Sequence, residues 1–326
     1  MRIGIYGFGS IGRLITRLLL ERGHEIVGVV DIDERILGKD IGEVLGTNKL
    51  GVVVSRDIRA LEEADVVVHA TGSYLDKVYY QLVSVVEMGI NVVSTCETLA
   101  YPYYRYPVLA RNLDDLARSY GVVVIGTGIN PGFIFDTLVT LLASSVPVVT
   151  WIRAVRSLNA AKRREPFRRK IGVGEKPEIV REKLTRGEIT GHVGYAESVY
   201  LIAQSGDLQL TRVEEHQEPV VAEETAESSG IRVEKGLCKG IVGYGVGYVG
   251  DKEVIRLELH AYVGAPEYEH ITIKSKDYSI EWKSTGTPGD LGTAAVVVNT
   301  VEKTPYLPPG LRLVTELLPV KVKFGV

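Results

Sequence analysis

Six residues near the N-terminus have the spacing of a phosphate-binding turn. GFGSIG, residues 7–12, follows a short apolar run and opens an amphipathic segment. In such a turn Gly7 permits the tight reversal, Gly9 lets the backbone approach a pyrophosphate, and Gly12 lets helix and strand pack closely. The helix N-terminus faces the phosphates. The cofactor contacts that we expect from this turn are Gly7, Gly9, Ser10, Ile11 and Gly12. The alternative is that the glycines only serve a tight turn.

A carboxylate follows where a ribose would be bound. Asp31 comes 19 residues after Gly12, at the end of the second predicted strand, where it would accept a hydrogen bond from a ribose 2′-hydroxyl. A carboxylate repels a 2′-phosphate, which favours NAD. Arg35, with Lys39 beyond it, could instead accommodate the phosphate of NADP, or could be a solvated loop residue. The sequence therefore predicts NAD or NADP as cofactor and leaves the choice open.

A third candidate is a glutamate that directly follows a strand-like run. Residues 92–102 read VVSTCETLAYP, with Glu97 between Cys96 and Thr98. Because glutamate is a poor turn former, its position at a strand end asks for an explanation beyond chain reversal. General acid/base chemistry is one explanation. An exposed loop glutamate is the alternative.

The elements that must position these residues can be predicted from periodicity. Strand-like runs alternate with amphipathic segments in the first part of the chain. This alternation predicts a doubly wound parallel α/β sheet of the Rossmann type. The strands are expected at 3–6, 25–31, 52–55, 65–70, 91–94 and 122–125, and the helices at 10–22, 74–88 and 106–120.

Ligands of such a sheet lie outside the carboxyl ends of its strands. Glu97 is therefore expected on the cofactor side of the sheet. In HATGS, residues 69–73, the small residues Ala70, Thr71 and Gly72 could lie against the cofactor, or the hydroxyl of Thr71 or Ser73 could simply cap the next helix. The connections expected at this edge are 7–10, 70–73, 94–98 and 126–130.

Asn130 belongs to the last of these connections, GTGINPG. It is a candidate cofactor contact. The other possibility is that it only caps the helix that we expect over residues 133–145.

The pattern changes after Gly132 and indicates a second, α+β domain. Segments 253–262 and 270–273 alternate apolar and polar residues, which predicts an antiparallel sheet with one covered face. Further helices are expected near 178–185 and 291–301. We expect a dinucleotide-binding domain over 1–130, a substrate-binding domain over 131–289, and packing of the segment 290–326 back onto the first domain.

Bulk properties favour small-molecule partners. The chain has 326 residues, 45% hydrophobic and 24% charged, with a net charge of -3, so we expect neither nucleic acid nor membrane as partner. The basic cluster KRREPFRRK, residues 162–170, could guide an anion but is more simply a solvated loop. Cys96 and Cys238 lack metal or redox spacing, which predicts no metal site and suits the cytoplasm. The composition is compatible with a thermophilic source.

Further segments occur in the order found in a known family. They are the TCE loop with its following aromatic–Pro pair, the NPGF turn, KIGVG (170–174), GHVGYAES (191–198), EPVVAE (218–223) and the closing G-D-x-x-T-A-A run (289–295). In this combination the chain resembles, over nearly its whole length, the 2,4-diaminopentanoate dehydrogenases and related native amine dehydrogenases of the dihydrodipicolinate-reductase-like group. The resemblance implies NAD(P)-dependent oxidative deamination of an amine carbon to a ketone, or the reverse reductive amination, with Glu97 as catalytic acid/base.

Chemistry agrees with that implied role of Glu97. Hydride can leave an amine carbon only when the nitrogen is neutral, so a nearby carboxylate that accepts a proton is useful. The same charge would stabilise an iminium and then activate the hydrolytic water. The resemblance implies 2,4-diaminopentanoate or a related amine as substrate, and a homodimer formed through the second domain.

The substrate-side candidates each have two interpretations. Arg156 could pair with a substrate carboxylate or form an interdomain ion pair, and Phe135 could line the pocket or pack in the core. His192 and His260 could touch substrate or be satisfied structural residues. Thr293 could approach cofactor or substrate, or contribute to capping.

Two rival functions remain at this point. A dihydrodipicolinate reductase would carry paired histidines with a nearby lysine and an Asp-Ala-Pro-Ser-Gly-Thr-Ala run, which this sequence lacks. A non-catalytic dinucleotide-binding sensor would need the glycine turn but no carboxylate such as Glu97.

Overall fold

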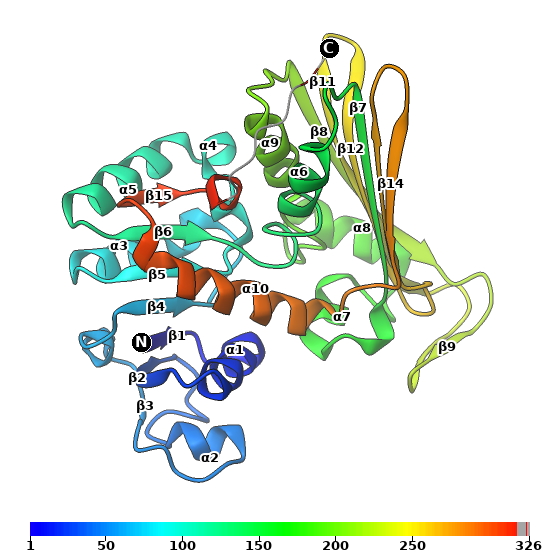
Figure 1. The fold of residues 1–326 in the computed structure, drawn as a ribbon. Helices are drawn as coiled ribbons and strands as arrows, with labels where there is room; N and C mark the ends of the chain where they lie inside the picture. Colours follow the sequence, from blue (N-terminus) through cyan, green and yellow to red (C-terminus); the bar gives the residue numbers. More distant parts are fainter. Residues whose placement is uncertain (318–323, 325–326) are drawn as a thin grey trace. The chain divides into compact units, whose positions relative to one another are not determined.

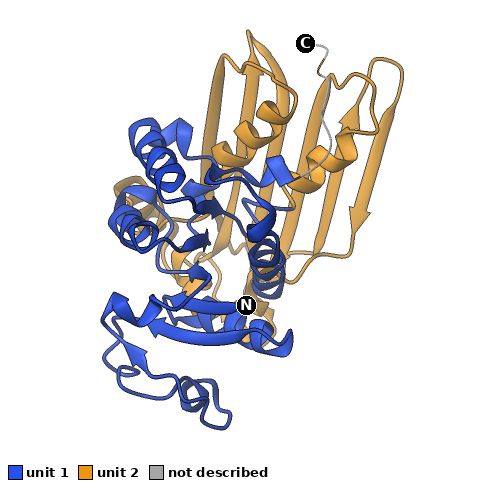
Figure 2. Ribbon diagram, turned by 60° about the vertical axis from the view of Figure 1, so that its left-hand side comes forward, with its two compact units in different colours: residues 1–133, 290–317 blue, residues 134–289, 318–326 orange. Residues whose placement is uncertain are grey.

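The computed structural model describes residues 1–317 and 324, which form two compact units (Figure 2). The first unit contains residues 1–133 and 290–317, and the second contains 134–289 together with Phe324. The predicted boundaries were 130/131 and 289/290. Residues 318–323, 325 and 326 of the predicted returning segment lie outside the described residues.

The first unit is built on a seven-stranded sheet in the order β15-β6-β5-β4-β1-β2-β3 (Figure 1). Each of its strand pairs is parallel. The predicted doubly wound parallel sheet is therefore confirmed, and β15 adds a strand that we did not predict. The strands are β1 (Arg2–Tyr6), β2 (Glu25–Val30), β3 (Val54–Ser55), β4 (Val66–His69), β5 (Asn91–Ser94), β6 (Val123–Gly126) and β15 (Gly310–Arg312).

Helices cover both faces of this sheet. Helices α3 (Leu75–Glu87) and α5 (Pro107–Ser119) share one apolar core with the strand residues Val67, Val92 and Val124. On the other face lie α1 (Ser10–Glu21) and α10 (Gly289–Lys303), joined by an ion pair of 3.1 Å between Arg22 and Glu302. The four predicted helices are confirmed to within two residues at each end. The shorter helices are α2 (Ile41–Leu45), η1 (Ile58–Leu61), η2 (Glu97–Leu99), α4 (Pro102–Arg105), η4 (Thr304–Tyr306) and η5 (Val314–Leu317).

The second unit is built on a six-stranded sheet in the order β14-β13-β7-β12-β11-β8. Its β7–β12 pair is parallel, so the predicted antiparallel sheet is wrong at that pairing and the sheet is mixed. Apolar–polar alternation fixes which face a residue occupies but not the direction of the neighbouring strand. The strands are β7 (Trp151–Asn159), β8 (Arg212–Val221), β11 (Cys238–Val249), β12 (Lys252–Tyr262), β13 (Tyr268–Lys274) and β14 (Ser279–Ser284), with the hairpin β9 (Ala226–Ser228) and β10 (Ile231–Val233).

One helix packs directly on a glycine face of this sheet. In β11, Gly243 and Gly245 point toward α9 (Tyr195–Ser205), and a methyl group added at Gly245 would lie 2.8 Å from the Cβ atom of Tyr195. The glycines therefore let α9 approach the sheet closely. The other helices of this unit are α6 (Thr137–Ala143), η3 (Ala160–Lys162), α7 (Glu165–Lys170) and α8 (Pro177–Arg186).

Two local predictions in the second unit are wrong. The basic cluster 162–170 is not a solvated loop, because it contains α7, whose Phe167 is buried beneath the Arg163 guanidinium at 4.3 Å. Helix α6 begins at Thr137 rather than near residue 133, since Asp136 accepts the hydrogen bond that caps it. None of the helices described for residues 1–317 combines the length and apolar character that a membrane crossing requires.

Candidate active site

Four connections meet at the carboxyl edge of the first unit's sheet. The backbone N–H of Thr95 donates to the carbonyl of His69 at 2.9 Å, and that of Thr127 donates to the carbonyl of Ser94 at 2.8 Å. A methyl group added at Gly7 would lie 2.6 Å from the carbonyl oxygen of Ala70. The structure thus brings together the connections 7–10, 70–73, 94–98 and 126–130.

The glycine turn has the geometry that a pyrophosphate requires. Gly7 has a φ of 98°, in the left-handed region, and a methyl group at Gly12 would lie 2.0 Å from the Gly7 carbonyl oxygen. A methyl group at Gly9 would meet nothing within 4 Å. Gly9 is also the N-cap of α1 and makes no side-chain capping bond, so this helix end keeps N–H groups for a ligand. These residues fit a dinucleotide.

Asp31 lies directly after β2 and beside the glycine turn. Its carboxylate accepts hydrogen bonds from the backbone N–H groups of Phe8 and Asp33. Arg35 forms a bidentate pair with Asp33, at 2.8 Å from Nε and from Nη2, and these bonds lower the pKa of Asp33 to about 2. Lys39 is exposed. The charge of Arg35 is therefore balanced by Asp33 in the absence of a ligand.

Glu97 is the first residue of the 3₁₀ turn η2 and is half-buried. On one side of it, burial raises the pKa of the Cys96 thiol to about 12, so the thiol stays neutral. On the other side, the Thr98 hydroxyl accepts the backbone N–H of Leu75 at 2.8 Å and so caps α3. The predicted caps Thr71 and Ser73 are wrong, because the cap comes from the neighbouring loop.

The 126–132 turn lies beside the start of α10 within the first unit. The Thr293 methyl group is 3.7 Å from the position of a methyl group added at Gly128. Asn130, half-buried, precedes a cis Pro131 and does not cap α6. The interpretation of Asn130 as a helix cap is therefore wrong, and Thr293 and Asn130 belong to the same corner of the first unit.

Arg156 and His260, in the second unit, point to opposite faces of its sheet. In the β7–β12 register Arg156 pairs with Leu259, whereas His260 pairs with Ser157, and neighbouring residues of a strand face opposite ways. Arg156 is 2% exposed and its Nε lies 3.4 Å from an equally buried Glu269 carboxylate. Arg156 thus has a charged partner within its own unit, and the structure does not bring it together with His260.

His192 is a different case. It is buried, and its Nε2 atom has no hydrogen-bond partner among the described residues. Burial, followed by the nearby cations Lys170, Arg156 and Arg163, lowers the pKa of His192 to about 3, so the ring is neutral. Sequence reasoning missed Lys170 and Arg163 because it assigned them to a solvated loop. The KIGVG motif, which begins at Lys170, was the signal that could have identified them.

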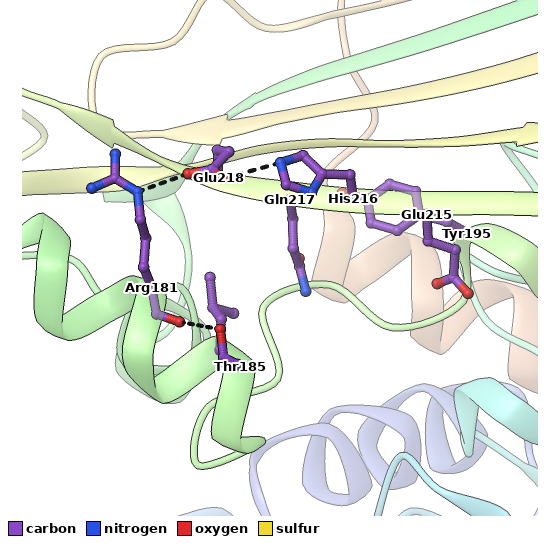
Figure 3. Close-up of a pocket in the computed structure, with 8 residues that line it drawn as sticks. Arg181, Thr185, Tyr195, Glu215, His216, Gln217 and Glu218 are labelled. Carbon is purple, nitrogen blue, oxygen red and sulfur yellow. Dashed lines mark hydrogen bonds and ion pairs between the residues drawn. The ribbon is translucent and has the colours of Figure 1, made fainter.

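The second unit also contains Phe135, which is fully buried in the apolar core. A cavity of about 330 Å³ lies between α8, α9 and β8 and contains none of the predicted site residues (Figure 3). Its carboxylate Glu218 pairs with Arg181 at 2.9 Å and with His216 at 3.0 Å. Within the described residues no cluster of three His, Cys, Asp or Glu side chains forms a potential metal site.

Comparisons with known proteins cover the whole chain. Residues 133–323 match the family described as 2,4-diaminopentanoate dehydrogenase C-terminal domain, and residues 1–97 match dihydrodipicolinate reductase, N-terminus. A 2,4-diaminopentanoate dehydrogenase of Acetoanaerobium sticklandii is 31% identical over 97% of this chain and 93% of its own. A 4-hydroxy-tetrahydrodipicolinate reductase of Archaeoglobus fulgidus is 39% identical over only 22% of this chain and 27% of its own.

Solved structures share the fold. An amine dehydrogenase from Mycobacterium smegmatis has a TM-score of 0.87 at 24% identity and covers 99% of this chain and 97% of its own. A dipicolinate-bound dihydrodipicolinate reductase from Paenisporosarcina sp. TG-14 has a TM-score of 0.54 at 13% identity, over 98% of this chain and 99% of its own.

Proposed function

This chain belongs to the 2,4-diaminopentanoate dehydrogenase family, and we propose that it catalyses NAD(P)-dependent oxidative deamination of a primary amine to a ketone and ammonia, and the reverse reaction. We propose 2,4-diaminopentanoate or a related amine as substrate. The observation that carries the proposal is the position of Glu97, a half-buried carboxylate at the same edge of the sheet as the glycine turn.

A nicotinamide cofactor held at the glycine turn, Gly7 to Gly12, would supply the acceptor for the hydride of the amine carbon. The carboxylate of Glu97 takes a proton from the substrate ammonium, because only a neutral nitrogen can release the hydride. Glu97 passes this proton to solvent and is negative again, so it stabilises the iminium of the substrate. It then takes a proton from the water that attacks the iminium and returns that proton to the departing nitrogen. The substrate in its ammonium form, water and oxidised cofactor together give ketone, ammonium ion, reduced cofactor and one proton.

We propose NAD as the preferred cofactor. Asp31 accepts the N–H of Phe8 in the glycine turn, and in the proposed complex it would accept a hydrogen bond from the ribose 2′-hydroxyl. Asp33 already neutralises Arg35, the cation closest in sequence that could hold a 2′-phosphate. Asp33→Asn would release Arg35. We expect this variant to raise the ratio of kcat/KM for NADP⁺ to that for NAD⁺ by about tenfold, while an unchanged ratio would argue against the assignment.

On the substrate side, His192 is supported better than Arg156. The buried Nε2 of His192 has no hydrogen-bond partner among the described residues and can accept from a donor, whereas Arg156 is already paired with Glu269. We therefore propose His192 as a substrate contact. Lys170 and Arg163, whose charges reach His192, would favour a substrate that carries a carboxylate.

The test uses a panel of amines and one isosteric variant. The wild type is assayed for reduction of NAD⁺ and NADP⁺ with 2,4-diaminopentanoate and simple primary amines, at alkaline pH and raised temperature. Glu97→Gln should keep its affinity for NADH but lose about 100-fold or more in kcat/KM. Glu87→Gln, an exposed carboxylate at the far end of α3, is the matched control and should behave as wild type. Near-normal turnover in Glu97→Gln would end the proposed role.

We also propose that the enzyme works as a homodimer in the cytoplasm. The face of the second unit's sheet opposite α9 carries the aromatic residues Trp151, Tyr244 and Tyr248 among ion pairs, which suits an interface with a second copy. Both cysteines are free and buried, which suits a reducing compartment. Sedimentation of the wild type and of Tyr244→Asp tests the dimer, since the charge should shift the equilibrium toward monomer.

A further inference from the structure

A buried histidine joins the two loops that surround the proposed reaction site. His69 ends β4 and is completely buried. Its Nδ1 lies 2.8 Å from the hydroxyl of Ser94, at the end of β5. Its Nε2 lies 2.8 Å from the Thr71 hydroxyl and 2.9 Å from Oε1 of Gln81. The ring therefore touches the 70–73 connection on one side and the strand that leads to Glu97 on the other.

The partners of His69 fix the direction of each hydrogen bond. Oε1 of Gln81 can only accept, and it also accepts from the Thr71 hydroxyl at 2.6 Å, so the ring proton lies on Nε2. Nδ1 then accepts from the Ser94 hydroxyl. The Ser94 oxygen in turn accepts the backbone N–H of Cys96, the residue before Glu97, at 3.1 Å. A directed chain of hydrogen bonds thus runs from the turn that carries Glu97 to Gln81 of α3.

Backbone hydrogen bonds fasten the same two loops on both sides of Glu97. Before it, the N–H of Thr95 donates to the carbonyl of His69 at 2.9 Å; after it, the N–H of Thr98 donates to the carbonyl of Ser73 at 3.1 Å. The Glu97 turn is therefore bonded to the neighbouring loop on both sides.

We propose that His69 is a positioning residue, which fixes the Glu97 turn against the 70–73 connection so that the acid/base and the cofactor keep one geometry. This inference rests on the proposed function. Burial lowers the pKa of His69 to about 4, so the ring stays neutral and keeps this donor–acceptor arrangement at neutral and alkaline pH. A histidine that only fills the core would contribute to stability and not to the rate of the reaction.

The hydrogen bonds on each side of the His69 ring can be removed by separate substitutions. Ser94→Ala removes the link to the Glu97 turn, and we expect kcat for amine oxidation to fall about tenfold or more with the affinity for NADH unchanged within about twofold. Thr71→Val keeps the shape of the side chain but removes the hydroxyl that ties the 70–73 connection to His69 and Gln81, and should instead weaken NADH binding. His69→Gln should show both effects.

The matched control lies on the same strand at the opposite edge of the sheet. Asn91 donates to the carbonyl of Asp65 and accepts the N–H of Val123, both at 2.9 Å. Asn91→Ala should lower the melting temperature without changing kcat or the affinity for NADH. This separates a loss of stability from a loss of positioning.

Hydrogen exchange of the backbone amides of residues 96–99 supplies a readout that does not depend on turnover. Faster exchange there in Ser94→Ala than in Asn91→Ala, together with the kinetic split, would support the inference. A folded Ser94→Ala with wild-type kcat and wild-type exchange would overturn it, whatever His69→Gln does. If the wild type oxidises no amine, or if Glu97→Gln is fully active, the proposed function fails instead, while exchange still decides whether His69 holds the turn.

Discussion

The ion pair between Arg156 and Glu269 gives a sharp prediction about stability. Both side chains are buried, 2% and 1% exposed, with 3.4 Å between Nε and Oε1. Glu269 also accepts the backbone N–H of Thr287 at 2.9 Å and the hydroxyl of Ser284. Nη2 of Arg156 donates to the Thr287 carbonyl at 2.9 Å. Glu269→Gln keeps the shape of the side chain but removes the negative charge that Glu269 places beside the buried guanidinium.

The expected loss follows from burial. Removing one partner of a buried ion pair costs about 3–5 kcal/mol, because the remaining charge stays desolvated. The control is Glu165→Gln in α7, where Glu165 pairs with Arg169 at 2.7 Å and the side chains are 57% and 71% exposed. An exposed pair of this kind contributes about 1 kcal/mol or less.

Urea unfolding of the second unit, followed by far-UV circular dichroism, measures both losses. Replacing the whole pair by apolar groups, Arg156→Met with Glu269→Leu, should recover most of the stability, since neither charge of the pair is then left buried. The reasoning is refuted if Glu269→Gln lies within about 1 kcal/mol of the wild type, or no lower than Glu165→Gln.

Two further predictions concern the glycine turn and the buried histidines. Gly9→Ala should fold normally, because a methyl group there meets nothing within 4 Å, and should bind NADH weakly. Gly12→Ala should also lower the free energy of unfolding by about 1–3 kcal/mol, because its methyl group clashes with Gly7. Calorimetry and NADH titration separate the two effects, and equal stability of the two variants would contradict the packing argument. Burial lowers the pKa of His69 to about 4 and that of His192 to about 3. Between these values and about 6.5 the unfolded chain binds more protons than the folded chain, so the free energy of unfolding rises with pH by about 1.4 kcal/mol per pH unit for each histidine. His69→Gln should reduce that slope in urea titrations between pH 4.5 and about 6, and an unchanged slope would contradict a neutral buried ring.

Local sequence patterns were sufficient to predict the first unit's parallel sheet except for its strand β15. The alternation of short apolar runs with amphipathic segments predicted its sheet, and Gly7 to Gly12 with Asp31 predicted the cofactor edge, because each feature depends on residues close together in the sequence. The same reasoning placed Glu97 at this edge.

What could not be predicted depends on partners that are distant in the sequence. Helix α9 has almost no exposed face, so it lacks the amphipathic period that would reveal it. The Thr98 hydroxyl caps α3, and Glu269 neutralises Arg156, only after folding brings these residues together. His69 looked like an ordinary strand residue for the same reason. The relation of Arg156 to His260 required the strand register, which periodicity does not supply.

The central claim is that Glu97 is the acid/base of amine oxidation, and chemical rescue tests it most directly. The measurement is the single-turnover rate of NADH formation by Glu97→Ala, with the amine that the wild type oxidises, in the absence and presence of formate. We predict a loss of about 100-fold or more that added formate partly restores, since a free carboxylate can occupy the space of the missing side chain and accept the proton. A rate within about tenfold of the wild type without formate would contradict the claim.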